Sequence, residues 1–308
     1  MLTSLKKTVI VVCGPTAVGK TSAAILLAKH FHSEIISADS RQCYKELKIG
    51  VARPSEEELK QAPHYFIASN SITENINAAY FEQYALQKID ELFQKHDVVI
   101  MVGGTGLYIK AFTEGLDAIP EVDGSVRKKI ITEYEAKGLQ WLQEEVKTKD
   151  PSFYILGEIQ NPQRMMRALE VIESTGRSIL DFRSNKKATR DFNIIKIGLE
   201  LPKEELHQNI NLRVDKMIDE GLVKEVSSLK GYRDVNALQT VGYSEIFEHL
   251  DGKISLDAAI DEIKKNTRQY AKRQMTWFKK DKEINWISAK ETDEIIVMAQ
   301  KLVEQINK

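Results

Sequence analysis

Short apolar runs alternate with amphipathic stretches over the first hundred residues of the chain. Thr8–Cys13 is continuously apolar after its first residue, rich in β-branched side chains and short, which is typical of a strand buried on both faces of a parallel sheet. Residues 33–37 and 97–102 predict two more strands, and residues 21–31 and 78–95 predict helices. This alternation indicates right-handed βαβ crossovers and therefore a parallel sheet covered by helices.

The pattern changes after about residue 114. Between residues 120 and 190 the periodicity is helical, with predicted helices at 126–137, 139–147 and 162–174. A strand is predicted again at 193–201, and the chain from residue 203 onward is predicted to be helical. We therefore predict an α/β core made of residues 1–119 and 191–308, interrupted by an all-helical insertion domain of residues 120–190.

Composition narrows the class of protein. The 308 residues include 44 Lys or Arg and 45 Asp or Glu, so the formal net charge of −1 excludes a uniformly basic surface but leaves room for a local basic groove. No apolar run approaches the roughly 18–20 residues of a membrane span. The two cysteines, Cys13 and Cys43, form neither a disulfide framework nor a zinc site, which favours a cytoplasmic protein.

A glycine-rich loop follows the first predicted strand. Gly14-Pro-Thr-Ala-Val-Gly-Lys-Thr21 fits the G-x-x-x-x-G-K-[ST] pattern, with a strand before it and a helix after it. In such a P-loop, backbone N–H groups surround phosphate oxygens, the lysine adds a positive charge, and the Thr21 hydroxyl is offered to Mg²⁺. The loop predicts a P-loop NTPase-like core that binds a diphosphate. It does not indicate which molecule carries that diphosphate. The predicted diphosphate-binding residues are Gly14, Thr16, Ala17, Val18, Gly19, Lys20 and Thr21.

Two polar residues follow other strands at the same predicted edge of the sheet. Asp39 comes after residues 33–37, at the carboxyl edge where ligands of open α/β sheets bind. It could have a function, holding metal or accepting a proton, or it could cap a helix. Its position alone favours the function and the cap about equally. Thr105 follows two glycines and could reach a phosphate oxygen, although spacing alone favours a tight turn.

Two stretches are locally basic. Residues 264–282 hold eight Lys or Arg against Asp281, and Arg268 and Lys272 share one helical face. Residues 163–190 hold seven Lys or Arg against three acids. A solvated helix face is the commoner origin of one such run, but basic faces with aromatic neighbours also suit phosphate backbones and unstacked bases. Because two such basic runs lie outside the P-loop unit, nucleic-acid binding is modestly favoured over two solvated helix faces.

Several motifs together resemble the bacterial tRNA dimethylallyltransferases. They are the glycine loop, Asp39-Ser-Arg-Gln-Cys-Tyr-Lys45, Val102-Gly-Gly-Thr-Gly-Leu-Tyr108, Arg167-Ala-Leu-Glu-Val171, Arg213-Val-Asp-Lys-Met217, Val241-Gly-Tyr243 and the stretch Thr267–Phe278. The resemblance runs in order over roughly residues 8 to 287. It implies transfer of a dimethylallyl group from dimethylallyl diphosphate to N6 of the adenine on the 3′ side of the anticodon, in tRNAs reading codons that begin with U. It also implies Mg²⁺ as cofactor.

The resemblance assigns roles to particular residues. Asp39 is expected to be the general base, and Thr105 and Arg213 are expected to complete the diphosphate clamp. A monomer that grips the tRNA anticodon stem-loop and flips the target base is expected. The expected tRNA contacts are Asp39, Ser40, Arg41, Gln42, Gln163, Arg164, Met165, Met166, Arg167, Gln239, Thr240, Val241, Gly242, Tyr243, Arg268 and Lys272.

Three other functions stay open on the residues alone. A small-molecule kinase on the same core would bind ATP and transfer a phosphoryl group. A free-nucleotide isopentenyltransferase would share the core and the alkylation chemistry, but the long insertion and the basic stretches favour tRNA. A GTPase-like RNA-binding switch ranks last, because no guanine-reading N-K-x-D motif occurs.

Overall fold

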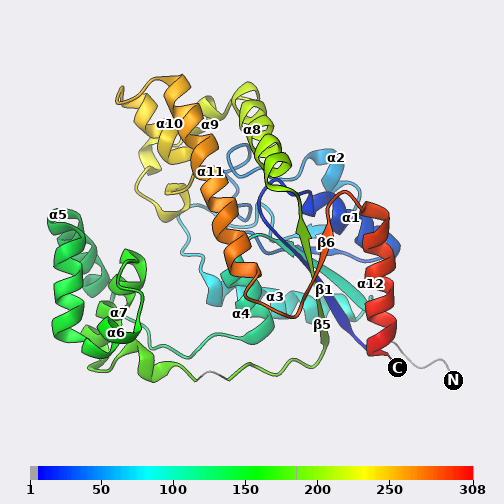
Figure 1. The fold of residues 1–308 in the computed structure, drawn as a ribbon, viewed down its shortest axis with the longest axis horizontal. Coiled ribbons are helices and arrows are strands. Elements are labelled where there is room, and N and C mark those ends of the chain that lie inside the picture. Colours follow the sequence, from blue (N-terminus) through cyan, green and yellow to red (C-terminus); the bar gives the residue numbers. More distant parts are fainter. Residues whose placement is uncertain (1–5, 185, 308) are drawn as a thin grey trace. The chain divides into compact units, whose positions relative to one another are not determined.

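A single parallel sheet organises the larger part of the chain (Figure 1). The structure, a computed structural model, describes residues 6–184 and 186–307. Its sheet has the order β3-β2-β4-β1-β5-β6, and every strand pair is parallel. The strands are β1 (Thr8–Cys13), β2 (Ile35–Ser37), β3 (His64–Tyr65), β4 (Val98–Gly103), β5 (Asn193–Glu200) and β6 (Ile284–Ser288). The predicted α/β class with a P-loop-type core is confirmed.

The strands are apolar on both faces because helices cover both. Alternate residues of β1 enter two different cores: Val9 and Val11 pack into one, Ile10 and Val12 into the other. Every residue of β1 and β4 is buried, which explains their continuous apolar runs. The helices around the sheet are α1 (Lys20–His30), α2 (Glu56–Leu59), α3 (Ala78–Phe93), α4 (Gly106–Glu114), α8 (Lys203–Asp219), α9 (Leu222–Ser228), α10 (Tyr243–Leu250), α11 (Leu256–Phe278) and α12 (Thr292–Ile306), with short 3₁₀ turns η2 (Lys230–Tyr232) and η3 (Asn236–Leu238).

The strand register brings three loops to one edge of the sheet. Cys13, the last residue of β1, pairs with Gly103 of β4 and Gly198 of β5. β2 ends at Ser37, which pairs with Val102. The glycine loop, the segment from Asp39 and the turn at Thr105 therefore all leave the carboxyl edge of the sheet together, as the sequence predicted.

Residues 115–188 form a separate compact unit, while the other unit ends at Glu114 and resumes at Thr189. Within it lie α5 (Gly124–Lys149), α6 (Pro151–Leu156), α7 (Pro162–Thr175) and the 3₁₀ turn η1 (Ile179–Phe182). These elements share their own core, centred on Leu142, Val146 and Phe153. Gly138 has φ 77°, so a kink divides α5 where two helices were predicted.

One element was predicted wrongly. The sequence from residue 203 onward was expected to be helical, with breaks near Gly221, Gly231, Gly242 and Gly252. Residues 284–288 instead form β6, which pairs with β5 at the edge of the sheet. This strand is only five residues long and half-buried, so its apolar signal is weak beside the long helices that flank it. Among the described residues, no helix is long and apolar enough to cross a membrane.

Candidate active site

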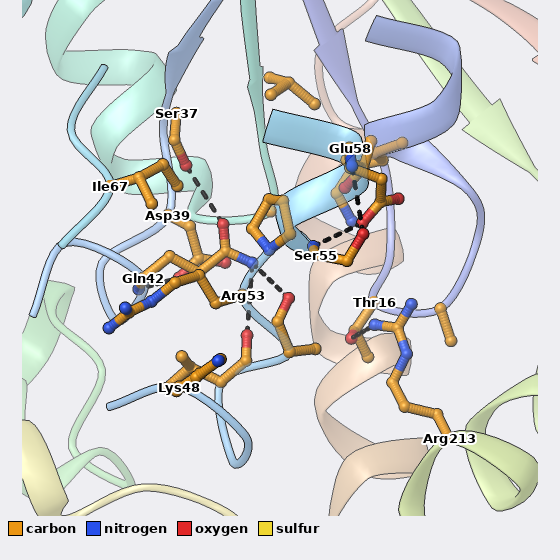
Figure 2. Close-up of a pocket in the computed structure, with 18 of the residues that line it drawn as sticks. Thr16, Ser37, Asp39, Gln42, Lys48, Arg53, Ser55, Glu58, Ile67 and Arg213 are labelled. Carbon is orange, nitrogen blue, oxygen red and sulfur yellow. Dashed lines mark hydrogen bonds between the residues drawn. The ribbon is translucent and has the colours of Figure 1, made fainter. Parts of the chain in front are cut away.

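A cavity of about 720 Å³ opens at the carboxyl edge of the sheet (Figure 2). Its walls come from the glycine loop and the start of α1, from the ends of β2 and β4, from the segment 48–58, and from α8 and α11. The lining residues include Thr16, Lys20, Thr21, Asp39, Gln42, Arg53, Gly104, Arg213, Tyr270 and Gln274. The cavity is thus lined by five of the seven predicted diphosphate-binding residues, by the candidate base Asp39 and by Arg213, whereas Gly14, Val18 and Thr105 are not among its lining residues.

The glycine loop is shaped by close backbone contacts. Gly14 has φ 144°, and a Cβ there would lie 2.6 Å from the Leu199 carbonyl oxygen, so only glycine fits. Gly19 has φ 101° and starts α1 without a side-chain cap, which leaves the first N–H groups of that helix for a ligand. The Val18 side chain is buried, so it packs in the core, and only its backbone can face an anion.

Two cations point into the cavity near the loop. Arg213 Nη1 donates a hydrogen bond to Thr16 Oγ1 at 3.3 Å, and Lys20 Nζ donates to the Pro15 carbonyl oxygen at 2.7 Å. The Lys20 side chain is half-buried. Burial, followed by the Arg213 charge, lowers the pKa of Lys20 to about 8, while the negative charge of Asp39 acts to raise this pKa. Burial also lowers the pKa of Arg213. Because the Arg213 charge disfavours the charged form of Lys20, an anion bound between the two cations would be stabilised.

Asp39 lies across the cavity from Arg213 (Figure 2). Its Oδ1 accepts hydrogen bonds from the backbone N–H groups of Arg41 at 2.9 Å and Gln42 at 3.2 Å. The residue therefore caps a turn rather than a helix. Among the described residues its Oδ2 accepts no hydrogen bond, so that oxygen is available to a substrate proton.

Thr105 is tied to the residue that follows Asp39. Its Oγ1 accepts a hydrogen bond from the Ser40 backbone N–H at 3.0 Å, and its hydroxyl lies 3.3 Å from Ser40 Oγ. The Thr105 backbone N–H donates to the Ala38 carbonyl oxygen at 3.3 Å. The structure thus joins the Thr105 turn to the Asp39 segment, as a tight turn at this edge of the sheet would do.

The segment 48–54, one wall of the cavity, is held by a carboxylate that the sequence did not single out. Glu225 accepts hydrogen bonds from the backbone N–H groups of Lys48, Ile49 and Gly50, at 2.8–3.1 Å, and from the Tyr243 hydroxyl at 2.6 Å. Burial and Glu225 together raise the pKa of Tyr243. Such a contact joins residues about 175 positions apart, and no local pattern signals it.

Three of the residues expected to contact tRNA have buried side chains. The Tyr243 side chain is fully buried and packs beside Gly50, where a Cβ would come within 2.5 Å of its ring. Met165 and Met166 are buried in the core of the helical unit. The side chains of these three residues pack against other protein residues, and the contacts with tRNA expected at these positions stay predictions.

The other expected tRNA contacts vary in how free their side chains are. Gln163, Gln239 and Lys272 are exposed. Arg164 pairs with Glu158, Arg167 with the buried Glu170 at 3.0 Å, Arg41 with Asn236 at 3.3 Å, and Arg268 with Asn211 at 2.8 Å. Gln42 donates to the Ala52 carbonyl oxygen at 2.9 Å and so supports the cavity wall. Ser40 is half-buried and lies beside Thr105. The side chains of Thr240 and Val241 are also half-buried. Gly242 is buried, and its backbone N–H donates a hydrogen bond to Glu245.

The parallel sheet with a glycine loop between β1 and α1 places the chain in the class of P-loop α/β folds. Residues 42–281 match the family model described as IPP transferase. The chain is 47% identical to the tRNA dimethylallyltransferase of Cytophaga hutchinsonii over 98% of this chain and 99% of that one. It is 49% identical to that of Christiangramia forsetii, over 92% and 94% of the two chains.

Solved structures agree with these relatives. The full-length tRNA isopentenylpyrophosphate transferase of Bacillus halodurans superposes with a TM-score of 0.72 at 34% identity, covering 97% of this chain and 98% of that one. A eukaryotic dimethylallyltransferase captured acting on tRNA gives a TM-score of 0.76 at 25% identity, with 97% and 80% covered. The chain belongs to the IPP transferase family and is a prenyl-transferring enzyme, which confirms the resemblance seen in its motifs.

Proposed function

We propose that this enzyme transfers a dimethylallyl group from dimethylallyl diphosphate to N6 of the adenine 3′-adjacent to the anticodon, in tRNAs that read codons beginning with U. The observation that carries the proposal is one cavity in which Lys20, Arg213 and the N-terminus of α1 face the carboxylate of Asp39. An anion-binding end opposite a proton acceptor suits a reaction that releases diphosphate and removes one proton. The choice of a dimethylallyl donor and of tRNA as acceptor rests on the names of the relatives.

The chemistry needs charge stabilisation more than a strong base. N6 attacks the allylic C1, the bond from C1 to the diphosphate oxygen breaks, and one N6 proton leaves. Lys20, Arg213 and the loop N–H groups stabilise the negative charge that develops on the diphosphate. Asp39 Oδ2 takes the proton, while Oδ1 stays bonded to its turn. Thr105 holds the Asp39–Ser40 segment in place.

The residues present also fit Mg²⁺. This ion keeps several waters and binds through one or two protein oxygens together with substrate phosphates. Thr21 offers a hydroxyl at the start of α1 and Asp39 a carboxylate in the same cavity, while the described residues contain no cluster of three or more acidic, His or Cys ligands. Thr21 would hold the ion against the diphosphate, where it would neutralise part of the leaving group's charge.

One assay tests the proposed function directly. The enzyme would receive dimethylallyl diphosphate labelled in the allyl group, together with a tRNA transcript, AMP or no acceptor. We expect label in the tRNA alone, at the adenine beside the anticodon. Label in AMP would support a free-nucleotide enzyme instead, and ATP turnover without label transfer would support a kinase.

We also propose that the helical unit of residues 115–188 contributes tRNA affinity through Gln163, Arg164 and Arg167, together with Ser40, Arg41, Gln239, Arg268 and Lys272 of the other unit. Each unit has its own core, and enzyme and tRNA are proposed to act as a one-to-one complex with a monomeric protein. Phosphate-directed basic side chains make such binding strongly dependent on salt.

Replacing residues 115–188 by a short Gly/Ser linker tests this division. Arg190 donates hydrogen bonds to the carbonyl oxygens of Ala111 and Phe112, so the chain resumes next to the end of α4 and a short linker suffices. We expect tRNA affinity to fall by more than tenfold in a filter-binding assay, while dimethylallyl diphosphate binding measured by calorimetry persists. Unchanged tRNA affinity would contradict the proposal; loss of both ligands in a folded variant would show that the units do not divide the work.

A further inference from the structure

A buried amide on α11 connects two walls of the cavity. Gln274 is 7% exposed, and the other buried residues of α11 are apolar: Ala259, Ile263, Ala271 and Phe278. Its Oε1 accepts a hydrogen bond from the Thr16 backbone N–H at 2.8 Å. Its Nε2 donates to the Gly104 carbonyl oxygen, also at 2.8 Å. A buried amide is costly unless it is bonded, and here both ends are.

The two partners of this amide belong to the two halves of the proposed reaction. Thr16 lies in the glycine loop, and its hydroxyl accepts from Arg213. Gly104 precedes Thr105, which bonds to Ser40 beside Asp39. Hydrogen bonds through Gln274 therefore connect the glycine loop, where the diphosphate is proposed to bind, with the turn at Gly104–Thr105, which is bonded to the segment that carries Asp39.

Both bonds are directional, so the amide cannot be reversed. Turning it over would place Nε2, a donor, against the Thr16 N–H, and Oε1, an acceptor, against the Gly104 carbonyl oxygen, so neither hydrogen bond could form. The Thr16 N–H is also committed to Gln274, which leaves the N–H groups after Thr16 for the diphosphate. Gln274 consequently shapes the loop without being one of its anion ligands.

The glycine at position 104 makes room for this side chain. A Cβ on Gly104 would lie 2.3 Å from Gln274 Nε2, and its next neighbours, Gln274 Cδ and the Gly14 carbonyl oxygen, would be 3.6 Å away. Only the amide group obstructs a methyl group there. One turn further along α11, Trp277 fills the space beside Gly106 in the same way, with ring atoms 2.3 Å from a Cβ there. Thus α11 holds the turn after β4 at two points.

We propose that Gln274 is a positioning residue, which sets the distance between the donor-binding loop and the Asp39–Thr105 segment through its two hydrogen bonds. This inference rests on the proposed function, since it concerns how donor and acceptor are aligned. Displacements of about 1 Å in such an alignment can cost on the order of 10²-fold in rate. Gln274 itself touches neither reacting atom in this scheme.

The test is a double-mutant cycle between positions 274 and 104. Q274A removes both bonds and empties the space, while G104A pushes the amide aside and leaves α11 unchanged. We expect each single variant to lower the single-turnover rate at saturating tRNA and donor, on the order of 10²-fold for Q274A, with tRNA affinity unchanged. We expect the double variant to be no slower than Q274A, because the new methyl group then meets no amide.

Two further variants separate positioning from general damage. Q274E keeps the size of the side chain and the acceptor for Thr16, but its ionised carboxylate cannot donate to the Gly104 carbonyl oxygen. We expect a slow rate and a lowered unfolding temperature, because a buried carboxylate oxygen then faces that carbonyl oxygen. Q269A truncates an exposed glutamine of the same helix and should keep the wild-type rate. A folded Q274A or Q274E with wild-type rate, or losses that multiply in the double variant, would overturn the inference. Failure of the wild-type enzyme to label tRNA would instead overturn the proposed function.

Discussion

Replacing Lys20 by methionine is expected to lower the single-turnover rate of dimethylallyl transfer by about 10²- to 10³-fold, the range typical of removing one preorganised group that stabilises developing charge. Methionine keeps much of the length of the side chain and removes the ammonium that faces the cavity beside Arg213. The developing charge on the diphosphate then loses one of its two side-chain cations. The rate would be measured with labelled donor and excess enzyme at saturating tRNA.

Lys29 provides the matched control, because it lies on the same helix, α1, and is exposed with a hydrogen bond to Gln61. Lys29→Met changes the net charge by the same amount, so a general electrostatic effect would appear in both variants. We expect Lys29→Met to transfer at the wild-type rate. Equal losses in the two variants would contradict a specific role for Lys20.

The lowered pKa of Lys20 gives the same prediction a second readout. Burial and Arg213 bring this pKa to about 8 in the free enzyme. The protonated form attracts the diphosphate and the neutral form does not, so donor affinity should be full below pH 8 and should decline as the pH rises through 8. Calorimetric titrations of the wild type across this range should show the decline, and Lys20→Met should lack it.

The parts of the site that sequence reasoning predicts are those encoded locally. The glycine loop, Asp39 and Thr105 each follow an apolar strand directly, and the register of parallel strands carries them to one edge. Arg213 comes from α8, about two hundred residues away in sequence from Thr16, and only the family resemblance indicated it. Local pattern and topology together therefore predict the cavity residues that follow the strands better than those that come from α8 and α11.

The contacts that sequence reasoning missed join residues far apart in the chain. Gln274 and Thr16 are 258 positions apart, and Glu225 and Ile49 are 176 apart. Nothing near either residue distinguishes a buried, fully bonded side chain from a solvated one. The same limit applies to Tyr243, Met165 and Met166, which were expected to contact tRNA: their side chains are buried, and a sequence pattern does not separate packing from ligand contact.

The base assignment leads to the other large effect. Replacing Asp39 by asparagine should slow transfer by about 10²- to 10⁴-fold, the usual contribution of general acid–base catalysis. Asparagine keeps an Oδ1 that accepts from the Arg41 and Gln42 backbone N–H groups, so the turn survives. What it loses is the charged Oδ2 that takes the N6 proton. The single-turnover rate at saturating tRNA and donor is the measurement.

Glu220→Gln is the matched control, because it makes the same change from carboxylate to amide elsewhere on the cavity wall. Glu220 forms an ion pair with Lys216 at 3.6 Å, and both side chains are exposed. We expect that variant to keep the wild-type rate. Because Asp39→Asn preserves the turn, its tRNA affinity should match that of the wild type, whereas Asp39→Ala removes the turn cap as well and should also weaken binding of the anticodon stem-loop. Near-normal transfer by Asp39→Asn would mean that Asp39 serves the turn alone and that solvent or the leaving diphosphate accepts the proton.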